Sequence, residues 1–96
     1  MDKIVLPKDI RGLIRGMHPH LKKRVRSALE FILSEPFSGK ALIGELAGLR
    51  SLQVGSFRII YRIRDNKSIE IITIGPRERI YEETFRVIKR EKVNTQ

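Results

Sequence analysis

The sequence contains no cysteine, and only two of its 96 residues are histidine. The lack of cysteine excludes disulfide bonds and thiolate zinc sites. The chain has no run of 18 or more apolar residues, so we expect no membrane span. The apolar part of the first seven residues is too short for a secretory signal. The simplest prediction is a cytoplasmic protein.

Motifs for metal and nucleotide chemistry are also missing. The sequence has no glycine-rich loop ending in Lys-Ser/Thr, no HExxH and no carboxylate cluster suited to Mg²⁺. Glu78, Glu82 and Glu83 are explained as acids at a helix start, where the helix dipole favours them. His18 and His20 also stand at a helix start, and we interpret them as surface or capping residues. We therefore expect no metal and no cofactor.

Positive charge is the strongest feature of the composition. Twenty Lys and Arg against eleven Asp and Glu give a formal net charge of +9 and a pI near 10.5. Such an excess on a small domain favours a polyanionic partner: nucleic acid, an acidic protein or an anionic membrane surface. We favour nucleic acid or the ribosome. The length predicts one domain over residues 1–96.

The apolar pattern predicts an α+β fold in the order β-α-α-β-β-β-α. An N-terminal helical hairpin is expected to pack on a small, mostly antiparallel four-stranded sheet, followed by a C-terminal helix. The first strand is assigned to no particular place in the sheet. Predicted strands cover 3–6, 49–54, 57–64 and 69–74; helices cover 10–17, 21–33 and 77–89; a loop covers 37–48, turns 55–56 and 65–67, and a frayed end 93–96.

The strand at 57–64 alternates clearly between apolar and basic residues. Phe57, Ile59, Tyr61 and Ile63 point one way, and Arg58, Ile60, Arg62 and Arg64 point the other. We interpret Tyr61 as a core residue. The arginine face is either the solvated side of a half-buried sheet or a site for an anion.

Arginine and tyrosine suffice, in principle, to cut RNA, because RNA carries its own nucleophile in the 2′-hydroxyl. Guanidinium groups match phosphate and stabilise the charge that develops on it. A tyrosine accepts a proton only when neighbouring cations lower its pKa from about 10. Arg77 lies four residues before Tyr81, one helical turn away if the helix has begun. Tyr81 has a structural interpretation as well, as an anchor of the last helix.

Two motifs resemble the RelE/ParE family of bacterial toxins. LQVGSFRIIY at 52–61 is similar to the family pattern L-R-V-G-D-Y-R-V-I-Y, and IGPRERIY at 74–81 is similar to I-G-x-R-x-x-x-Y. The likeness extends from about Ile4 to Lys89. It implies a compact toxin neutralised by an antitoxin. The family includes RelE-like nucleases, which cleave mRNA in the ribosomal A site, and ParE-like poisons of DNA gyrase.

The resemblance also implies roles for individual residues. Arg58 and Arg77 correspond to arginines that stabilise the phosphorane and the leaving group, and Tyr81 to a tyrosine in proton transfer. The sequence departs from the pattern at Ser51 and Gln53, where many RelE-like members have basic residues, and at Phe57, where tyrosine is usual. Arg50 is expected to point to the opposite face. The predicted RNA- or ribosome-binding residues are Lys40, Arg50, Arg62, Arg64 and Arg79.

These observations lead to three hypotheses. The first is a ribosome-dependent mRNA endonuclease that acts without metal through 2′-hydroxyl attack; its partners are mRNA in the A site, ribosomal RNA and a cognate acidic antitoxin. The second is a gyrase inhibitor without nuclease activity. The third is a non-catalytic basic RNA- or ribosome-binding module. In the toxin hypotheses, the antitoxin should present an amphipathic helix or extended segment rich in Glu and Asp.

Overall fold

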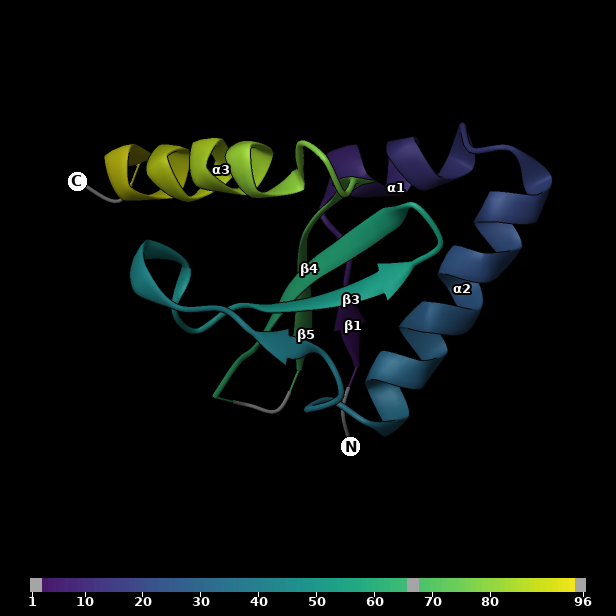
Figure 1. Cartoon of the computed structure of the whole chain (residues 1–96), viewed down its shortest axis with the longest axis horizontal. Helices are drawn as coiled ribbons and strands as arrows, with labels where there is room; N and C mark the ends of the chain where they lie inside the picture. The colour runs from purple at the N-terminus through teal and green to yellow at the C-terminus, as the bar shows by residue number, and fades with distance from the viewer. Residues whose placement is uncertain (1–2, 66–67, 95–96) are drawn as a thin grey trace.

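A computed structural model describes residues 3–65 and 68–94 of the chain, with side chains as far as Glu91 (Figure 1). The predicted turn at 65–67 and the predicted frayed end at 93–96 therefore lie partly outside the described residues. The elements are β1 (Ile4–Val5), α1 (Lys8–Arg15), α2 (Pro19–Ser34), β2 (Lys40–Ala41), a 3₁₀ turn (Gly44–Leu46), β3 (Arg50–Val54), β4 (Phe57–Ile63), β5 (Ile69–Pro76) and α3 (Ile80–Asn94). In the described residues, no helix is long and apolar enough to span a bilayer.

The predicted α+β fold is confirmed, but the described part of the sheet has five strands instead of four. Its order is β1-β5-β4-β3-β2, antiparallel except for the β1–β5 pair. The predicted loop at 37–48 contains the missed strand, β2, which pairs with only two residues of β3. Because both residues of β2 are exposed, no apolar pattern marks it. The first strand takes an edge position beside β5.

The last helix differs from its prediction at both ends. Residues 77–79 form a turn in which the Arg79 N–H donates to the Pro76 carbonyl (3.1 Å), and the helix begins at Ile80. It continues to Asn94, five residues beyond the expected end at Lys89. The acids that we assigned to a helix start divide accordingly: Glu82 and Glu83 lie in the first turn of α3, whereas Glu78 lies before it.

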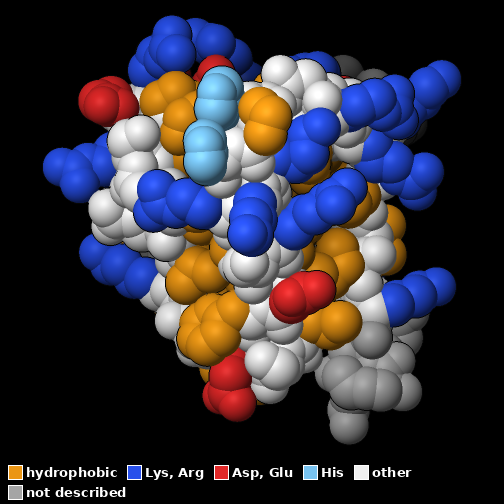
Figure 2. All heavy atoms as spheres, turned by 90° about the vertical axis from the view of Figure 1, so that its right-hand side faces the viewer, with side chains coloured by type: hydrophobic (Ala, Val, Ile, Leu, Met, Phe, Trp, Pro, Cys, Tyr) orange, Lys and Arg blue, Asp and Glu red, His pale blue; other side chains and the backbone are white. Residues whose placement is uncertain are grey.

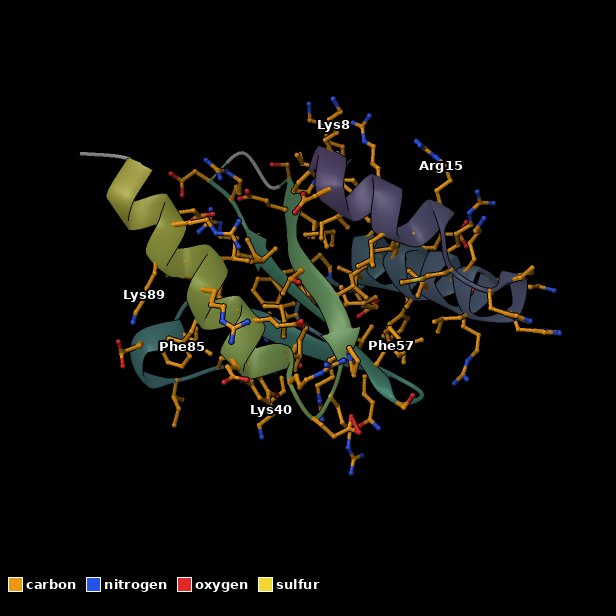
Figure 3. All side chains as sticks on the ribbon, turned by 90° about the horizontal axis from the view of Figure 1, so that it is seen from above. Lys8, Arg15, Lys40, Phe57, Phe85 and Lys89 are labelled. Atoms are coloured by element: carbon orange, nitrogen blue, oxygen red, sulfur yellow. The ribbon has the colours of Figure 1, made fainter. Side chains whose placement is uncertain are left out.

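Two hydrophobic cores lie on opposite faces of the sheet. The helical hairpin covers one face, and α3 covers the other (Figure 3). A register shift between β4 and β5 pairs Ile60 with Thr73 and Tyr61 with Ile71, which leaves Ile72 as an extra residue on β5. The shift explains the nearly continuous apolar run of this strand. Ile71 packs in the hairpin core, and Ile72 packs in the α3 core.

Tyr61 is a core residue, as predicted, and its side chain is 0% exposed. Its hydroxyl donates to the Pro36 carbonyl (2.8 Å) and accepts from the Gly39 N–H (2.9 Å). Both partners belong to the loop after α2, so one buried phenol ties this loop to the middle of the sheet. The bonds also satisfy polar groups that would be costly to bury unpaired.

The helical hairpin has clear local signals. His18 is the N-cap of α2: its Nδ1 accepts from the His20 N–H (3.3 Å), and Pro19 takes the first helical position, where its missing N–H costs nothing. The predicted capping role of His18 is confirmed. In the two-residue turn between β3 and β4, Gly55 adopts φ +63°, a conformation that glycine adopts without strain.

Candidate functional site

Arg58 lies on β4, on the face of the sheet that α3 covers. Its guanidinium donates to Ser51 Oγ (3.0 Å) and to Gln53 Oε1 (3.4 Å), both on the neighbouring strand β3. Ser51 is buried, which makes this contact well shielded from water. A guanidinium has five N–H donors, so three of those of Arg58 have no partner among the described residues. The side chain is held in one orientation and keeps donors for an anion.

Arg77 follows β5. It lies at the end of the sheet where β4 begins and where Arg58 is located. Arg58 pairs with Gly75 across the two strands, and the Arg77 N–H donates to the carbonyl of Ser56 (2.9 Å). The chain positions of the two arginines are therefore fixed relative to each other by backbone pairing. The Arg77 side chain is exposed, and within residues 3–65 and 68–94 its guanidinium has no hydrogen-bond or ion-pair partner.

Tyr81 lies in the first turn of α3. Its partly buried ring packs against the α3 core, a cluster that includes Leu46, Leu49 and Ile60. Ile60 is two residues beyond Arg58 on the same face of β4. The three predicted catalytic residues thus come from β4, the β5–α3 connection and the start of α3, and all three lie around the same end of the sheet. The packing also agrees with an anchoring role for the Tyr81 ring.

Two of the predicted binding arginines are engaged inside the protein. Arg62 donates from Nε to Glu70 (2.8 Å) and from Nη2 to Glu91 (3.2 Å) on α3, and Arg64 donates to Glu70 (2.6 Å). This network connects β4, β5 and the later turns of α3. Arg62 therefore stabilises the docked helix, Arg64 supports Glu70 within the network, and the two glutamates largely compensate both charges.

Arg50 points to the opposite face from Ser51, as predicted from strand alternation. Its Nη1 donates to the carbonyls of Phe37 (3.1 Å) and Gly39 (2.7 Å), and its guanidinium lies 5.0 Å from the centre of the Phe37 ring. Arg50 thus fastens the loop that Tyr61 also holds. The remaining predicted binding residues, Lys40 and Arg79, have exposed side chains.

Sequence reasoning missed the partners of these arginines. Ser51 and Gln53 were regarded only as departures from the family pattern, yet both hold Arg58. A signal existed, because the two-residue turn at 55–56 places residue 53 opposite residue 58. Glu70 and Glu91 had no comparable signal. In the part of the chain that the structure describes, no three His, Asp or Glu side chains are grouped to hold a metal ion.

The ion-pair network shifts two pKa values. Burial alone would raise the pKa of Glu70, but the hydrogen bonds and charges of Arg62 and Arg64 hold it below its ordinary value. Burial alone would likewise lower the pKa of Arg62, but Glu70 and Glu91 raise it above its ordinary value. Since the pKa of Glu70 is lower in the folded chain, its contribution to stability is present above about pH 4, the unfolded value. It is lost as the pH falls through the folded value.

Glu70→Gln is expected to lower the free energy of unfolding by about 1–2 kcal/mol at pH 7, because charge-assisted hydrogen bonds to Arg62 and Arg64 are lost. Urea unfolding at a series of pH values measures this effect. The difference from the unmodified protein should shrink below about pH 4, when Glu70 becomes protonated. Glu82→Gln is the control: this exposed residue is 3.9 Å from Arg86, and little change is expected. A pH-independent difference for Glu70→Gln would contradict the assignment.

Several solved structures that resemble this chain are toxins or toxin–antitoxin complexes. The chain is 28% identical to a chain of the toxin–antitoxin complex RelBE2 from Mycobacterium tuberculosis, with a TM-score of 0.68 over 78% of this chain and 96% of that one. A mutant of the E. coli toxin RelE in the free state gives 15% identity and a TM-score of 0.71 over 91% and 94%. The intact E. coli RelBE complex gives 14% and 0.65 over 76% and 93%. No curated protein sequence matches significantly.

The fold and the two motifs around Arg58 and Tyr81 define a toxin of the RelE/ParE superfamily, as predicted. The family model described as "ParE toxin of type II toxin-antitoxin system, parDE" matches residues 8–81, most of the chain. The chain therefore belongs to the ParE toxin family of type II toxin–antitoxin systems.

Proposed function

We propose that this toxin is a ribosome-dependent mRNA endonuclease that acts without metal. The observation that carries the proposal is the arrangement of Arg58, whose guanidinium is oriented by Ser51 and Gln53 beside the exposed Arg77. An oriented guanidinium at Arg58 and a second cation whose backbone is fixed nearby are suited to the phosphorane oxygens of a transition state, where positioned donors have their greatest effect. Action on ribosomes implies a cytoplasmic location.

In the proposed reaction, the 2′-oxygen of one nucleotide attacks the adjacent phosphorus, and the bond from phosphorus to the 5′-oxygen breaks. The products are a 2′,3′-cyclic phosphate, open to hydrolysis to a 3′-phosphate, and a 5′-hydroxyl. Arg58 and Arg77 stabilise the charge on the phosphorane and the leaving oxygen. The 2′ proton passes to the Tyr81 hydroxyl as the phenol releases its own proton to solvent, and the departing oxygen takes a proton from solvent. The ribosome positions the mRNA in line for attack, which supplies much of the acceleration.

A second function, inhibition of DNA gyrase without nuclease activity, is favoured by two other observations. The family model that matches is named for ParE, and Ser51 and Gln53 stand where many RelE-like toxins have basic residues. In this alternative, the bonds of Arg58 to Ser51 and Gln53 serve only to compensate a partly buried charge. Arg77 would then belong to a protein interface.

We also propose an acidic antitoxin as the partner in both cases. The excess of nine positive charges favours a partner rich in Glu and Asp. The structural relatives include complexes of RelE-type toxins with their antitoxins. Co-expression with the product of the neighbouring reading frame, followed by size exclusion, tests this point. Failure of the two proteins to elute together would contradict it.

The two functions separate in one pair of assays on the purified full chain. Primer extension on mRNA from programmed ribosomes should show a cut within the A-site codon, and none on the same mRNA without ribosomes. Gyrase incubated with supercoiled DNA and the toxin should accumulate no cleavage complexes. The reverse pair of results would overturn the nuclease proposal in favour of gyrase. Inactivity in both assays would leave only the binding-module hypothesis.

Tyr81→Phe tests the role of the hydroxyl separately from the packing of the ring. The phenylalanine keeps the packing of the ring against the α3 core, so the melting temperature should be unchanged. The rate of A-site cleavage is expected to fall about tenfold to hundredfold, a common loss when a group that transfers a proton is removed. Equal rates for the two proteins would remove Tyr81 from the reaction and leave it as an anchor of α3.

A further inference from the structure

The helical hairpin carries a set of cations that the fold does not use. Between Asp9 and Glu30 the chain contains no acidic residue. None of the basic residues in this interval has a carboxylate partner among the described residues. Figure 2 shows Lys and Arg side chains spread over this face, around the histidine pair. The set, which we call the hairpin cations, comprises Arg11, Arg15, Lys22, Lys23, Arg24 and Arg26.

Four hairpin cations converge on one groove between α1 and α2. Arg11 and Arg15 are one turn apart on α1, and Lys22 and Arg26 are one turn apart on α2. These four residues line a groove of about 280 Å³, together with Leu6, Ile14 and Leu29. Arg11 Nε donates to the Leu6 carbonyl (3.1 Å), which steadies this guanidinium. No acidic side chain lines the groove.

The other two hairpin cations lie on the far side of α2. Lys23 and Arg24 line a groove of about 540 Å³ between α2 and β3, again without an acidic side chain. The Arg24 guanidinium lies against the β3–β4 turn: a Cβ built at Gly55 would be 3.0 Å from its Nη1. Positive charge therefore extends across the whole width of the hairpin and reaches the sheet.

This arrangement is unfavourable for the isolated protein. Lys22, Lys23 and Arg24 lie near the N-terminus of α2, whose first turn contains no acid, although the helix dipole favours negative charge there. The pairs Arg11–Arg15 and Lys22–Arg26 place like charges at i,i+4, which costs about 0.2–0.5 kcal/mol each. A bound polyanion would turn these repulsions into favourable contacts.

We infer that the hairpin cations form a docking surface for the ribose–phosphate backbone of folded RNA. This inference rests on the proposed action at the ribosome. A phosphate backbone fits better than an acidic protein segment, because the cations are spread over two grooves and match a repeated negative charge. The hairpin cations differ in this respect from Arg50, Arg62 and Arg64, three of the five binding residues predicted from the sequence, which make bonds within the protein.

The position of this surface gives the toxin two working faces. The hairpin covers one face of the sheet. The other face is covered by α3, and Arg58 of the proposed reaction site lies on that face. In Figure 3, Arg15 on α1 and Lys89 on α3 lie on opposite sides of β5. Folded RNA bound to the hairpin would leave Arg77 free for the strand to be cut. In this arrangement, the hairpin cations provide affinity for RNA, and the residues of the proposed reaction site on the α3 face carry out the cleavage.

Two variants with equal charge test the inference. One carries Lys22→Gln, Lys23→Gln, Arg24→Gln and Arg26→Gln on the hairpin. The control carries Lys3→Gln, Arg86→Gln, Lys89→Gln and Arg90→Gln, all at exposed positions outside the helical hairpin. Each loses four of the nine net positive charges. Fluorescence anisotropy with a labelled RNA duplex of about 20 base pairs, at several salt concentrations, measures affinity and its salt dependence. A DNA duplex of the same sequence is measured in parallel.

The hairpin variant should bind RNA at least about tenfold more weakly, with a slope of log affinity against log salt shallower by about 2 to 4, since each phosphate contact contributes about 0.9. Its melting temperature should be no lower than that of the unmodified protein, because repulsion is relieved. The control should retain most of the affinity. Equal losses in both variants would indicate unspecific charge attraction and overturn the inference.

Other outcomes also decide. Unchanged RNA binding by the hairpin variant, with lost antitoxin binding, would assign the surface to an acidic protein. Stronger dependence on the hairpin for DNA than for RNA would assign it to DNA and contradict the inference. Arg77→Ala separates the inference from the proposed function: this variant should keep the RNA affinity of the unmodified protein. RNA docking that needs the hairpin, without any A-site cleavage, would overturn the nuclease alone.

Discussion

Arg77→Ala is expected to lower A-site cleavage about a hundredfold to a thousandfold, the loss typical when one fixed donor to a developing negative charge is removed. The effect should lie in the rate and not in folding. The Arg77 side chain is exposed, and its backbone N–H, which alanine keeps, makes the bond to Ser56. Single-turnover cleavage on programmed ribosomes, with a thermal melt of the same samples, measures both quantities.

Arg86→Ala is the matched control for this experiment. It removes one exposed arginine from α3 at a position outside the proposed site, so cleavage should change less than about threefold. Arg77→Lys gives a further comparison, because lysine keeps the charge but lacks the planar fork that fits phosphate. We expect this variant to recover only part of the rate. Full activity of Arg77→Ala would remove Arg77 from the catalytic group.

Gly39→Ala is expected to lower the free energy of unfolding by about 3 kcal/mol, a large effect for the addition of one methyl group. A Cβ at this position would lie 2.6 Å from the Tyr61 hydroxyl oxygen and 2.9 Å from Cε1 of its ring. The ring is fully buried and cannot move aside, so the change adds overpacking and breaks the hydrogen bonds of the hydroxyl. Urea unfolding measures the loss.

A double-mutant cycle with Tyr61→Phe identifies the cause. Tyr61→Phe alone should cost about 1–2 kcal/mol, because the Gly39 N–H and the Pro36 carbonyl lose their partner. The combined variant should be less destabilised than the sum of the two, by at least about 1 kcal/mol, since removing the hydroxyl relieves the closest contact. Additive losses would contradict this explanation.

Gly12→Ala serves as the control for Gly39→Ala, because it is expected to raise the free energy of unfolding and not to lower it. Gly12 lies inside α1, and a Cβ there would meet no atom within 4 Å. Because alanine is the better helix former, we expect a gain of about 0.5–1 kcal/mol in the same unfolding measurement.

The sequence predicts the parts of the fold that depend on local signals. The helical hairpin follows from apolar spacing, and the β3–β4 pairing follows from the two-residue turn at Gly55, which sets the register of the strands on either side. The alternation of apolar and basic residues along β4 also places Tyr61 in the core. What is missed depends on distant partners: β2 is a strand only because β3 lies beside it, and neither of its two residues shows this.

The candidate site divides in the same way. The positions of Arg58, Arg77 and Tyr81 at one end of the sheet follow from the order of the strands. The engagement of Arg62 with Glu70 does not, because it depends on the length of the β4–β5 loop and on the extra residue near Ile72. A register different by one residue would turn Glu70 to the other face. On the arginine face of β4, Arg62 therefore serves to stabilise the fold, and Arg58 belongs to the candidate site.

The pairing of β1 with β5 affects how the toxin is made. β1 precedes β5 by more than sixty positions, and the Ile69 N–H donates to the Lys3 carbonyl (2.7 Å). β5 also supplies Ile71 to one core and Ile72 to the other. A nascent chain therefore lacks the strand that joins β1 to the rest of the sheet until β5 has emerged, and such distant pairing is slow to form. We therefore expect the newly made polypeptide to reach its active shape only late in translation, after the residues of β5 have been added.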